Sequence, residues 1–186
     1  MGCPPQVPVT GARKSVKIFG AIELWRARFN YRQETVFNAA TYLGFLDQLA
    51  RGYRRRGAIL IQDNASYHKD REVWAWFQSN RHWLEVHQLP PYSPELNPTE
   101  RLWQHTRKNG THNRFFSGVD SLLATLKRVF EEMQSYPQMI RPISRLSVDC
   151  NVPLFMRVCI VDLTAQFPEN PLFAHELALI QPEILD

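Results

Sequence analysis

Hydrophobic positions along residues 15–142 alternate between the spacing typical of strands and the spacing typical of helices. The pattern predicts four strands, at residues 15–22, 26–31, 58–62 and 84–89. It also predicts four helices, at residues 38–53, 70–79, from 97 or 99 to about 110, and 120–134. Because strands and helices are interspersed along the chain, we expect an α/β fold with helices packed on one mixed sheet.

Two of these elements have distinctive patterns. In the helix at 38–53, apolar residues recur at helical spacing after Asn38, which is a favourable N-cap residue. The strand at 58–62 is almost continuously apolar, which is typical of a strand buried on both faces of a sheet. It ends at the polar pair Asp63-Asn64.

The pattern divides the chain into three parts. Residues 1–14 are rich in Pro and Gly and predict an irregular lead-in, and residues 15–142 form the main domain. Residues 143–186 predict a C-terminal appendage of unknown role, with a possible strand at 156–163 and a short helix at 173–180. This last part is interpreted either as a native appendage or as sequence foreign to the fold.

The net charge of +4 is unevenly distributed, since residues 1–116 are basic and residues 117–186 are acidic. A basic surface favours binding to a phosphate backbone, although a solvated surface without a partner explains the charge equally well. No run of apolar residues is long enough to span a membrane, and no export signal is evident. The expected location is therefore the cytoplasm.

Two acids occupy positions where ligands commonly bind in α/β folds. Asp63 follows a buried strand, and Glu100 lies in the first turn of a helix that follows a proline-rich loop. Carboxylates that meet at such an edge bind hard divalent cations, so Mg²⁺ or Mn²⁺ is the expected cofactor. Taken singly, each acid has a structural alternative, as a turn residue for Asp63 and as a helix-start acid for Glu100.

The two acids lie within a longer motif. Asp63-Asn64-Ala65-Ser66-Tyr67-His68 is followed by Tyr92-Ser93-Pro94-Glu95-Leu96-Asn97-Pro98-Thr99-Glu100, with 36 residues between the two acids. Over roughly residues 7–142, the chain resembles the DDE catalytic domain of bacterial insertion-sequence transposases of the mariner superfamily. The resemblance implies an RNase H-like fold and metal-dependent cleavage and transfer of DNA strands, with transposon ends and target DNA as partners.

The resemblance also implies roles for individual residues. Asp63 corresponds to the second catalytic acid and metal ligand, and Glu100 to the third. Asn64, His68 and Asn97 correspond to supporting positions of the motif and not to metal ligands.

One part of the family pattern is absent from its expected place. The first catalytic Asp of the family lies on a central strand that precedes the segment matched here, and residues 1–14 contain no acid. The sequence therefore predicts a C-terminal transposase fragment that lacks the first central strand of its sheet. Unpaired strand edges would make this fragment marginally stable alone, unless residues 1–14 or another polypeptide fills the gap. With two of the three acids, we also expect weak metal binding and little or no DNA cleavage, which the missing N-terminal part supplied in trans should restore.

Basic residues suggest where DNA would lie. Arg107, Lys108 and Arg114 follow the helix that carries Glu100, and Arg54, Arg55 and Arg56 end an earlier helix. Three functions therefore remain open: a transposase catalytic domain, a non-catalytic product that binds DNA or dimerises with an intact transposase, and an α/β domain whose acids are merely structural.

Overall fold

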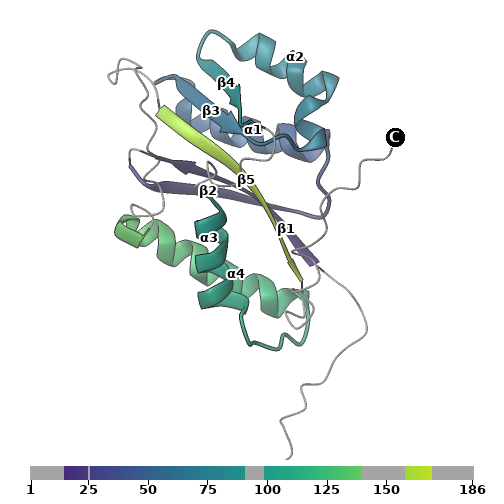
Figure 1. Ribbon diagram of the computed structural model, residues 1–186, viewed down its shortest axis with the longest axis vertical. Coiled ribbons are helices and arrows are strands. Elements are labelled where there is room, and N and C mark those ends of the chain that lie inside the picture. The colour runs from purple at the N-terminus through teal and green to yellow at the C-terminus, as the bar shows by residue number, and fades with distance from the viewer. Residues whose placement is uncertain (1–14, 25, 91–98, 140–157, 169–186) are drawn as a thin grey trace, which may run out of the picture.

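The computed structural model describes residues 15–24, 26–90, 99–139 and 158–168. Its centre is a mixed five-stranded sheet in the order β2-β1-β5-β3-β4 (Figure 1). The strands are β1 (Ser15–Glu23), β2 (Arg28–Glu34), β3 (Ala58–Gln62), β4 (Leu84–Gln88) and β5 (Val158–Pro168). β1 is antiparallel to β2 and β5, whereas β3 is parallel to both β4 and β5.

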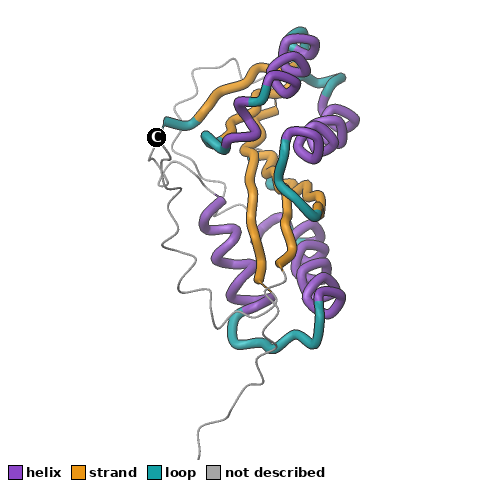
Figure 2. The backbone as a smooth tube through the Cα atoms, turned by 90° about the vertical axis from the view of Figure 1, so that its right-hand side faces the viewer, coloured by secondary structure: helices purple, strands orange, loops and turns teal. Residues whose placement is uncertain are grey.

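Helices cover both faces of this sheet (Figure 2). They are α1 (Ala39–Tyr53), α2 (Arg71–Asn80), α3 (Thr99–Thr106) and α4 (Val119–Ser135). Short helical turns connect them: η1 (Ser66–Lys69), the π-helical η3 (Arg107–Thr111) and η4 (Pro137–Met139). The helices predicted from the sequence are confirmed in type and place, although α3 is shorter than expected.

Alternation along β1 divides the apolar core into two parts. Ile18 and Ile22 belong to a cluster with residues of α3 and α4, whereas Phe19 and Ala21 belong to a cluster with residues of α1 and α2. Successive residues of a strand point to opposite faces, so this central strand contributes to both clusters. The mixed α/β architecture inferred from the pattern is therefore confirmed.

Local signals explain the ends of α1. The side chain of Asn38 accepts a hydrogen bond from the Thr41 amide, and the Thr41 hydroxyl accepts one from the Asn38 amide, which forms a complete capping box. After the helix, Gly57 has a φ of 72°, a left-handed conformation that glycine adopts without steric cost.

The turn between β1 and β2 differs from the sequence prediction. We expected the second strand to begin at residue 26, but β2 begins at Arg28. Ala27 adopts a φ of 52° in the turn, although it is buried. Because positive φ is uncommon for alanine, the sequence carries no signal for this turn.

The largest difference concerns the middle of the sheet. The sequence predicts an open position between β1 and β3, but β5 occupies it and pairs with both neighbours (Figure 1). The segment expected to form a separate appendage after residue 142 therefore contributes the central strand. The expected helix at 173–180 lies outside the described residues.

Candidate metal and nucleic-acid site

The site begins where β3 ends. Gln62 is the last residue of β3, and Asp63 follows it at the edge where the parallel strands β3 and β4 have their carboxyl ends, while β5 continues past this edge along β1. Ligands of α/β proteins commonly bind at this edge, because the loops that leave the strands there converge. The fold therefore places Asp63 where the sequence predicted.

The Asp63 side chain is held by its own loop. Its Oδ1 accepts a hydrogen bond from the Ala65 amide at 2.9 Å and lies 3.1 Å from Nδ1 of His68. The helical turn η1 carries His68 back toward Asp63, where Nδ1 also lies 3.0 Å from the Asp63 carbonyl oxygen. The His68 side chain is only 2% exposed, whereas that of Asp63 is 40% exposed. A buried imidazole thus fixes a carboxylate that faces solvent.

These contacts favour the ionised form of Asp63. Burial alone would raise its pKa, but the hydrogen bonds from His68 and the Ala65 amide and the attraction of His68 outweigh burial, so the pKa lies below its ordinary value. Within the described part of the chain, Oδ2 of Asp63 makes no hydrogen bond. An ionised carboxylate on a side chain that is partly exposed to solvent suits a hard divalent cation.

Aromatic and polar side chains support this loop from the α1 side. The rings of Tyr42 and Tyr67 each lie 4.5 Å from the His68 ring, and the Tyr42 hydroxyl donates to Oε1 of Gln62 at 2.8 Å. These contacts hold Gln62, which precedes Asp63, and His68, which contacts it. The sequence analysis singled out His68 but neither Tyr42 nor Gln62, because their roles depend on contacts between distant segments.

Asn64 joins the loops that follow β3 and β4. Its Nδ2 donates to the Leu89 carbonyl at 2.7 Å, and the Leu89 amide donates to the Gln62 carbonyl at 2.8 Å. These two bonds fix the start of the proline-rich segment relative to Asp63. This contact gives Asn64 a structural role in shaping the site.

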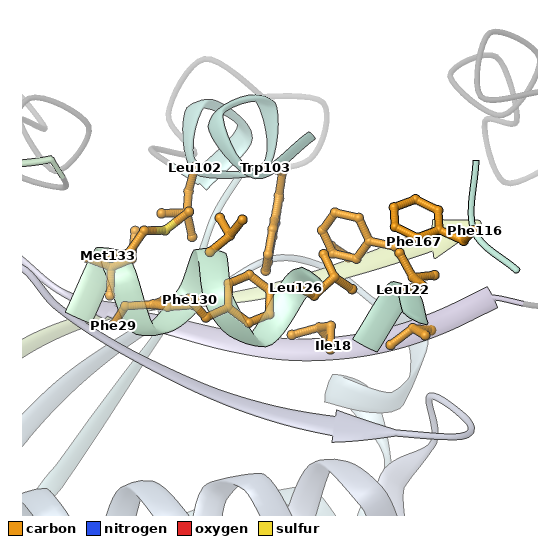
Figure 3. Close-up of a cluster of buried hydrophobic side chains, with 14 of the residues drawn as sticks. Ile18, Phe29, Leu102, Trp103, Phe116, Leu122, Leu126, Phe130, Met133 and Phe167 are labelled. Atoms are coloured by element: carbon orange, nitrogen blue, oxygen red, sulfur yellow. The ribbon is translucent and has the colours of Figure 1, made fainter. Parts of the chain in front are cut away.

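Glu100 lies in the first turn of α3. The described part of this helix is anchored by Leu102 and Trp103, both buried among residues of α4 and β5 (Figure 3). The Trp103 ring lies 5.7 Å from the Phe167 ring on β5, so α3 is packed directly against the central strand. Asn97, the other predicted support, lies outside the described residues.

β5 brings a further acid to this part of the sheet. Asp162 pairs with Ala21 of β1, and the last pair between β5 and β3 joins Val161 to Ile61. Asp162 therefore follows Val161 just as Gln62 follows Ile61, one residue before Asp63. In the sequence, Asp162 is an acid within the apolar run predicted as a possible strand at 156–163.

The structure separates the two basic groups. Arg54, Arg55 and Arg56 are exposed but precede β3, so the five residues of this strand separate them from Asp63 by about 17 Å or more. Arg107 and Lys108 begin η3 directly after α3, and the exposed Arg114 follows. Arg107, Lys108 and Arg114 are therefore connected to the helix that carries Glu100. Arg54, Arg55 and Arg56 lie at the amino end of β3, away from Asp63.

Within the ranges given above, no group of three or more His, Cys, Asp or Glu residues is arranged to hold a metal ion. No helix among those residues is long and apolar enough to cross a membrane. The candidate site therefore rests on Asp63, its supports and the backbone positions of Glu100 and Asp162.

Known proteins resemble this chain in sequence. The chain is 29% identical over 137 residues to the insertion element IS630 uncharacterized 39 kDa protein of Shigella sonnei, covering 73% of this chain and 40% of that protein. It is 29% identical over 113 residues to the Tcb2 transposase of Caenorhabditis briggsae and 36% identical over 83 residues to the Tc1 transposase of Caenorhabditis elegans. These matches cover 59% and 44% of this chain and 38% and 26% of the two transposases. The chain thus spans less than half the length of these three relatives.

A solved structure and a family model identify the fold and the family. The catalytic domain of the Mos1 mariner transposase superposes with a TM-score of 0.51 at 22% identity, covering 64% of this chain and 65% of that domain. This match confirms the predicted RNase H-like fold. The family model described as DDE superfamily endonuclease matches residues 1–123, about two thirds of the chain. The chain therefore belongs to the DDE superfamily endonucleases, the family to which the sequence motif pointed.

Proposed function

We propose that this chain carries a transposase active site for cleavage and transfer of DNA strands, with Asp63 and Glu100 as ligands of Mg²⁺ or Mn²⁺. The observation that carries the proposal is the Asp63 carboxylate at the carboxyl edge of β3. His68 and the Ala65 amide hold one oxygen, and the side chain as a whole remains 40% exposed to solvent. Two divalent ions in such a site can activate the attacking oxygen and stabilise the leaving oxygen of a phosphodiester.

The residues of this chain would prepare the site before DNA arrives. His68 keeps Asp63 ionised and oriented, and Asn64 holds the loop that leads toward α3. Trp103 packs against Phe167, and Leu102 packs among the buried residues of α4. These contacts fix α3, whose first turn carries Glu100. A carboxylate in that turn is also favoured by the helix dipole. Preorganised ligands of this kind reduce the rearrangement that the reaction requires.

DNA would contact the molecule near the end of α3. Lys108 and Arg114 are exposed and follow the helix that carries Glu100, so they are suited to bind phosphates beside the site. Arg54, Arg55 and Arg56 lie at the opposite edge of the sheet and would contact only a DNA segment that extends around the molecule.

A nicking assay on supercoiled plasmid tests the proposed activity. We expect nicking in Mn²⁺ and none with excess EDTA, and we expect Asp63→Asn and Glu100→Gln each to reduce the rate by at least about 100-fold, since each removes a charged ligand. Asp120→Asn, in the first turn of α4, is the matched control and should nick as the wild type does. Nicking that persists in Asp63→Asn would refute the assignment.

A second candidate function is DNA binding without cleavage, which the exposed Lys108 and Arg114 favour. Such binding would weaken steeply with salt, because each phosphate contact releases condensed counterions. Gel-shift titrations over a range of salt concentrations would identify it. A salt-dependent shift with no nicking in Mn²⁺ would favour this function over the catalytic one.

A further inference from the structure

The central strand of the sheet comes from a distant part of the sequence. β5 begins at Val158, almost 100 residues after the end of β3, and lies between β3 and β1 (Figure 1). The match to the family model ends at residue 123, so β5 lies outside it. The family match therefore implies nothing about a contribution of β5 to the site, and any such contribution has to be argued from this chain.

The pairing fixes the place of Asp162 in the sheet. Asp162 pairs with Ala21 on one side, and on the other it continues the parallel register of Ile61 with Val161. Neighbouring strands lie about 4.8 Å apart and each residue advances about 3.3 Å, so regular strand spacing extended from Ile61 and Val161 would separate the Cα atoms of Asp162 and Asp63 by about 6 Å. Carboxylates on such close backbone positions can share a cation, because Mg²⁺ binds oxygen at about 2.0–2.1 Å.

Asp162 is also an unusual residue for its strand. It is the only charged residue in Val158–Pro168, and the strand has a neighbour on each side within a sheet that is covered by helices on both faces. A carboxylate in such a strand is costly unless a cation or hydrogen-bond donors compensate its charge. An acid at this position of a central strand is therefore unusual and calls for an explanation.

A second observation at the same register position points to a polar site. Gln62 is fully buried, its Oε1 accepts from Tyr42, and its Nε2 has no hydrogen-bond acceptor among the described residues. Leaving a buried amide nitrogen without an acceptor is destabilising, because the group loses its hydrogen bonds to water. The last printed pair of β3 with β5 is Ile61 with Val161, so extending this register by one residue brings Asp162 beside Gln62, and an ionised Asp offers only acceptors.

We propose that Asp162 is the third carboxylate of the metal site, so that the acids follow one another along the chain as Asp63, Glu100 and Asp162. The inference rests on the proposed function, because it assumes that Asp63 already binds a divalent cation. It replaces the expectation of an incomplete site: the acid that is absent from the start of the chain is supplied by a strand near its end.

Titration calorimetry of the full chain with Mn²⁺ tests this assignment without relying on activity. We expect Asp162→Asn to weaken Mn²⁺ binding at least about 10-fold and Asp120→Asn to leave it unchanged. Equal binding by Asp162→Asn and the wild type would overturn the inference. If Asp63→Asn loses binding while Asp162→Asn does not, the proposed function stands and this inference fails. If Asp63→Asn also binds normally, the proposed function itself fails.

A cysteine variant distinguishes a ligand from a residue that only supports the fold. Thiolates prefer softer metals than carboxylates do, so Asp162→Cys should lose Mn²⁺ affinity and gain Cd²⁺ affinity relative to the wild type. Asp120→Cys is the control for a cysteine that is merely added, and it should not gain Cd²⁺ affinity. A Cd²⁺ affinity of Asp162→Cys no higher than that of this control would contradict a ligand role.

Discussion

At the scale of single residues, the site depends on how a buried histidine and a half-buried aspartate are combined. His68 is nearly inaccessible to solvent and contacts both the carboxylate and the carbonyl oxygen of Asp63. The Asp-Asn-x-x-x-His motif was recognisable in the sequence, but its purpose was not. The structure shows that the spacing allows one turn of 3-10 helix to bring His68 back to Asp63.

Replacing His68 should change the protonation of Asp63. In His68→Ala the burial of Asp63 remains largely unchanged while its largest stabilising hydrogen bond is lost, so the pKa of Asp63 should rise. Titration of the carboxyl carbon by NMR measures this directly, with His82→Ala, an exposed histidine, as the control. An unchanged pKa of Asp63 in His68→Ala would show that His68 does not hold the carboxylate ionised.

A second buried network predicts a pH dependence of stability. The Tyr53 hydroxyl lies 3.2 Å from Oε2 of the buried Glu23 and accepts from Asn30 at 2.9 Å. Burial and the charge of Glu23 raise the pKa of Tyr53 to about 12. Because unfolding returns this pKa to about 10, the stabilising contribution of Tyr53 is complete below pH ~10 and is lost as the pH rises toward 12.

Urea unfolding of the wild type and Tyr53→Phe between pH 8 and 12 tests this network. At pH 8 the variant should be less stable by about 1–3 kcal/mol, because Glu23 and Asn30 lose a buried partner. The difference should shrink above pH ~10, since only the wild type loses the contribution of the tyrosine. A constant difference across this pH range would contradict the raised pKa.

At the scale of elements, α3 is positioned by close packing against the sheet. A Cβ atom added at Gly20 of β1 would lie 3.0 Å from Cε2 of Phe29 and 3.2 Å from Cη2 of Trp103. The absence of a side chain at Gly20 therefore lets the Trp103 ring approach the strand. This contact connects the middle of the sheet to the helix that carries Glu100.

Two glycine-to-alanine variants should act in opposite directions. Gly20→Ala should destabilise the fold by about 1–3 kcal/mol, because the added methyl group crowds two buried aromatic rings. Gly52→Ala, where nothing lies within 4 Å of the added Cβ, should stabilise α1 by up to about 1 kcal/mol. Urea unfolding midpoints measure both changes. A neutral or stabilising Gly20→Ala would show that Trp103 does not pack tightly on β1.

Most elements between residues 15 and 135 could be predicted because their signals are local. The capping residue Asn38, the helical spacing of Tyr42, Phe45 and Leu46, and the apolar strand before Asp63 all act within a few residues. The turn before β2 could not be predicted, because Ala27 adopts its positive φ against its own preference and only the tertiary fold imposes it.

In the whole molecule, the middle position of the sheet is filled by β5, which lies in the segment that the sequence predicts to be an appendage. A pattern of apolar residues predicts that a strand exists, but it does not identify the strand's neighbours. β5 pairs with β1 and β3, both about 100 or more residues earlier in the chain, so its place could not be inferred from periodicity. The marginal stability was expected from unpaired strand edges between β1 and β3. Because β5 pairs with both strands in the described fold, this reason no longer applies.

A proline in β5 tests whether this strand holds the sheet together. Thr164 pairs with Phe19 in the antiparallel ladder, and a proline there fixes φ and removes an amide donor from the part of β5 that pairs with β1. We expect Thr164→Pro to lower the unfolding free energy by about 3 kcal/mol or more, or to abolish the cooperative urea transition. Thr164→Val keeps the backbone donor and should unfold cooperatively. A wild-type midpoint in Thr164→Pro would reinstate the open sheet predicted from the sequence.

The most direct test of the account is the position of Mn²⁺ in a crystal of the full chain, located by its anomalous scattering. The account predicts a peak at the carboxyl edge of β3, within about 2–2.5 Å of a carboxylate oxygen of Asp63 and of an oxygen from Glu100 or Asp162. A peak elsewhere, or none at Mn²⁺ concentrations that saturate binding in solution, would contradict the claim that these acids form one metal site.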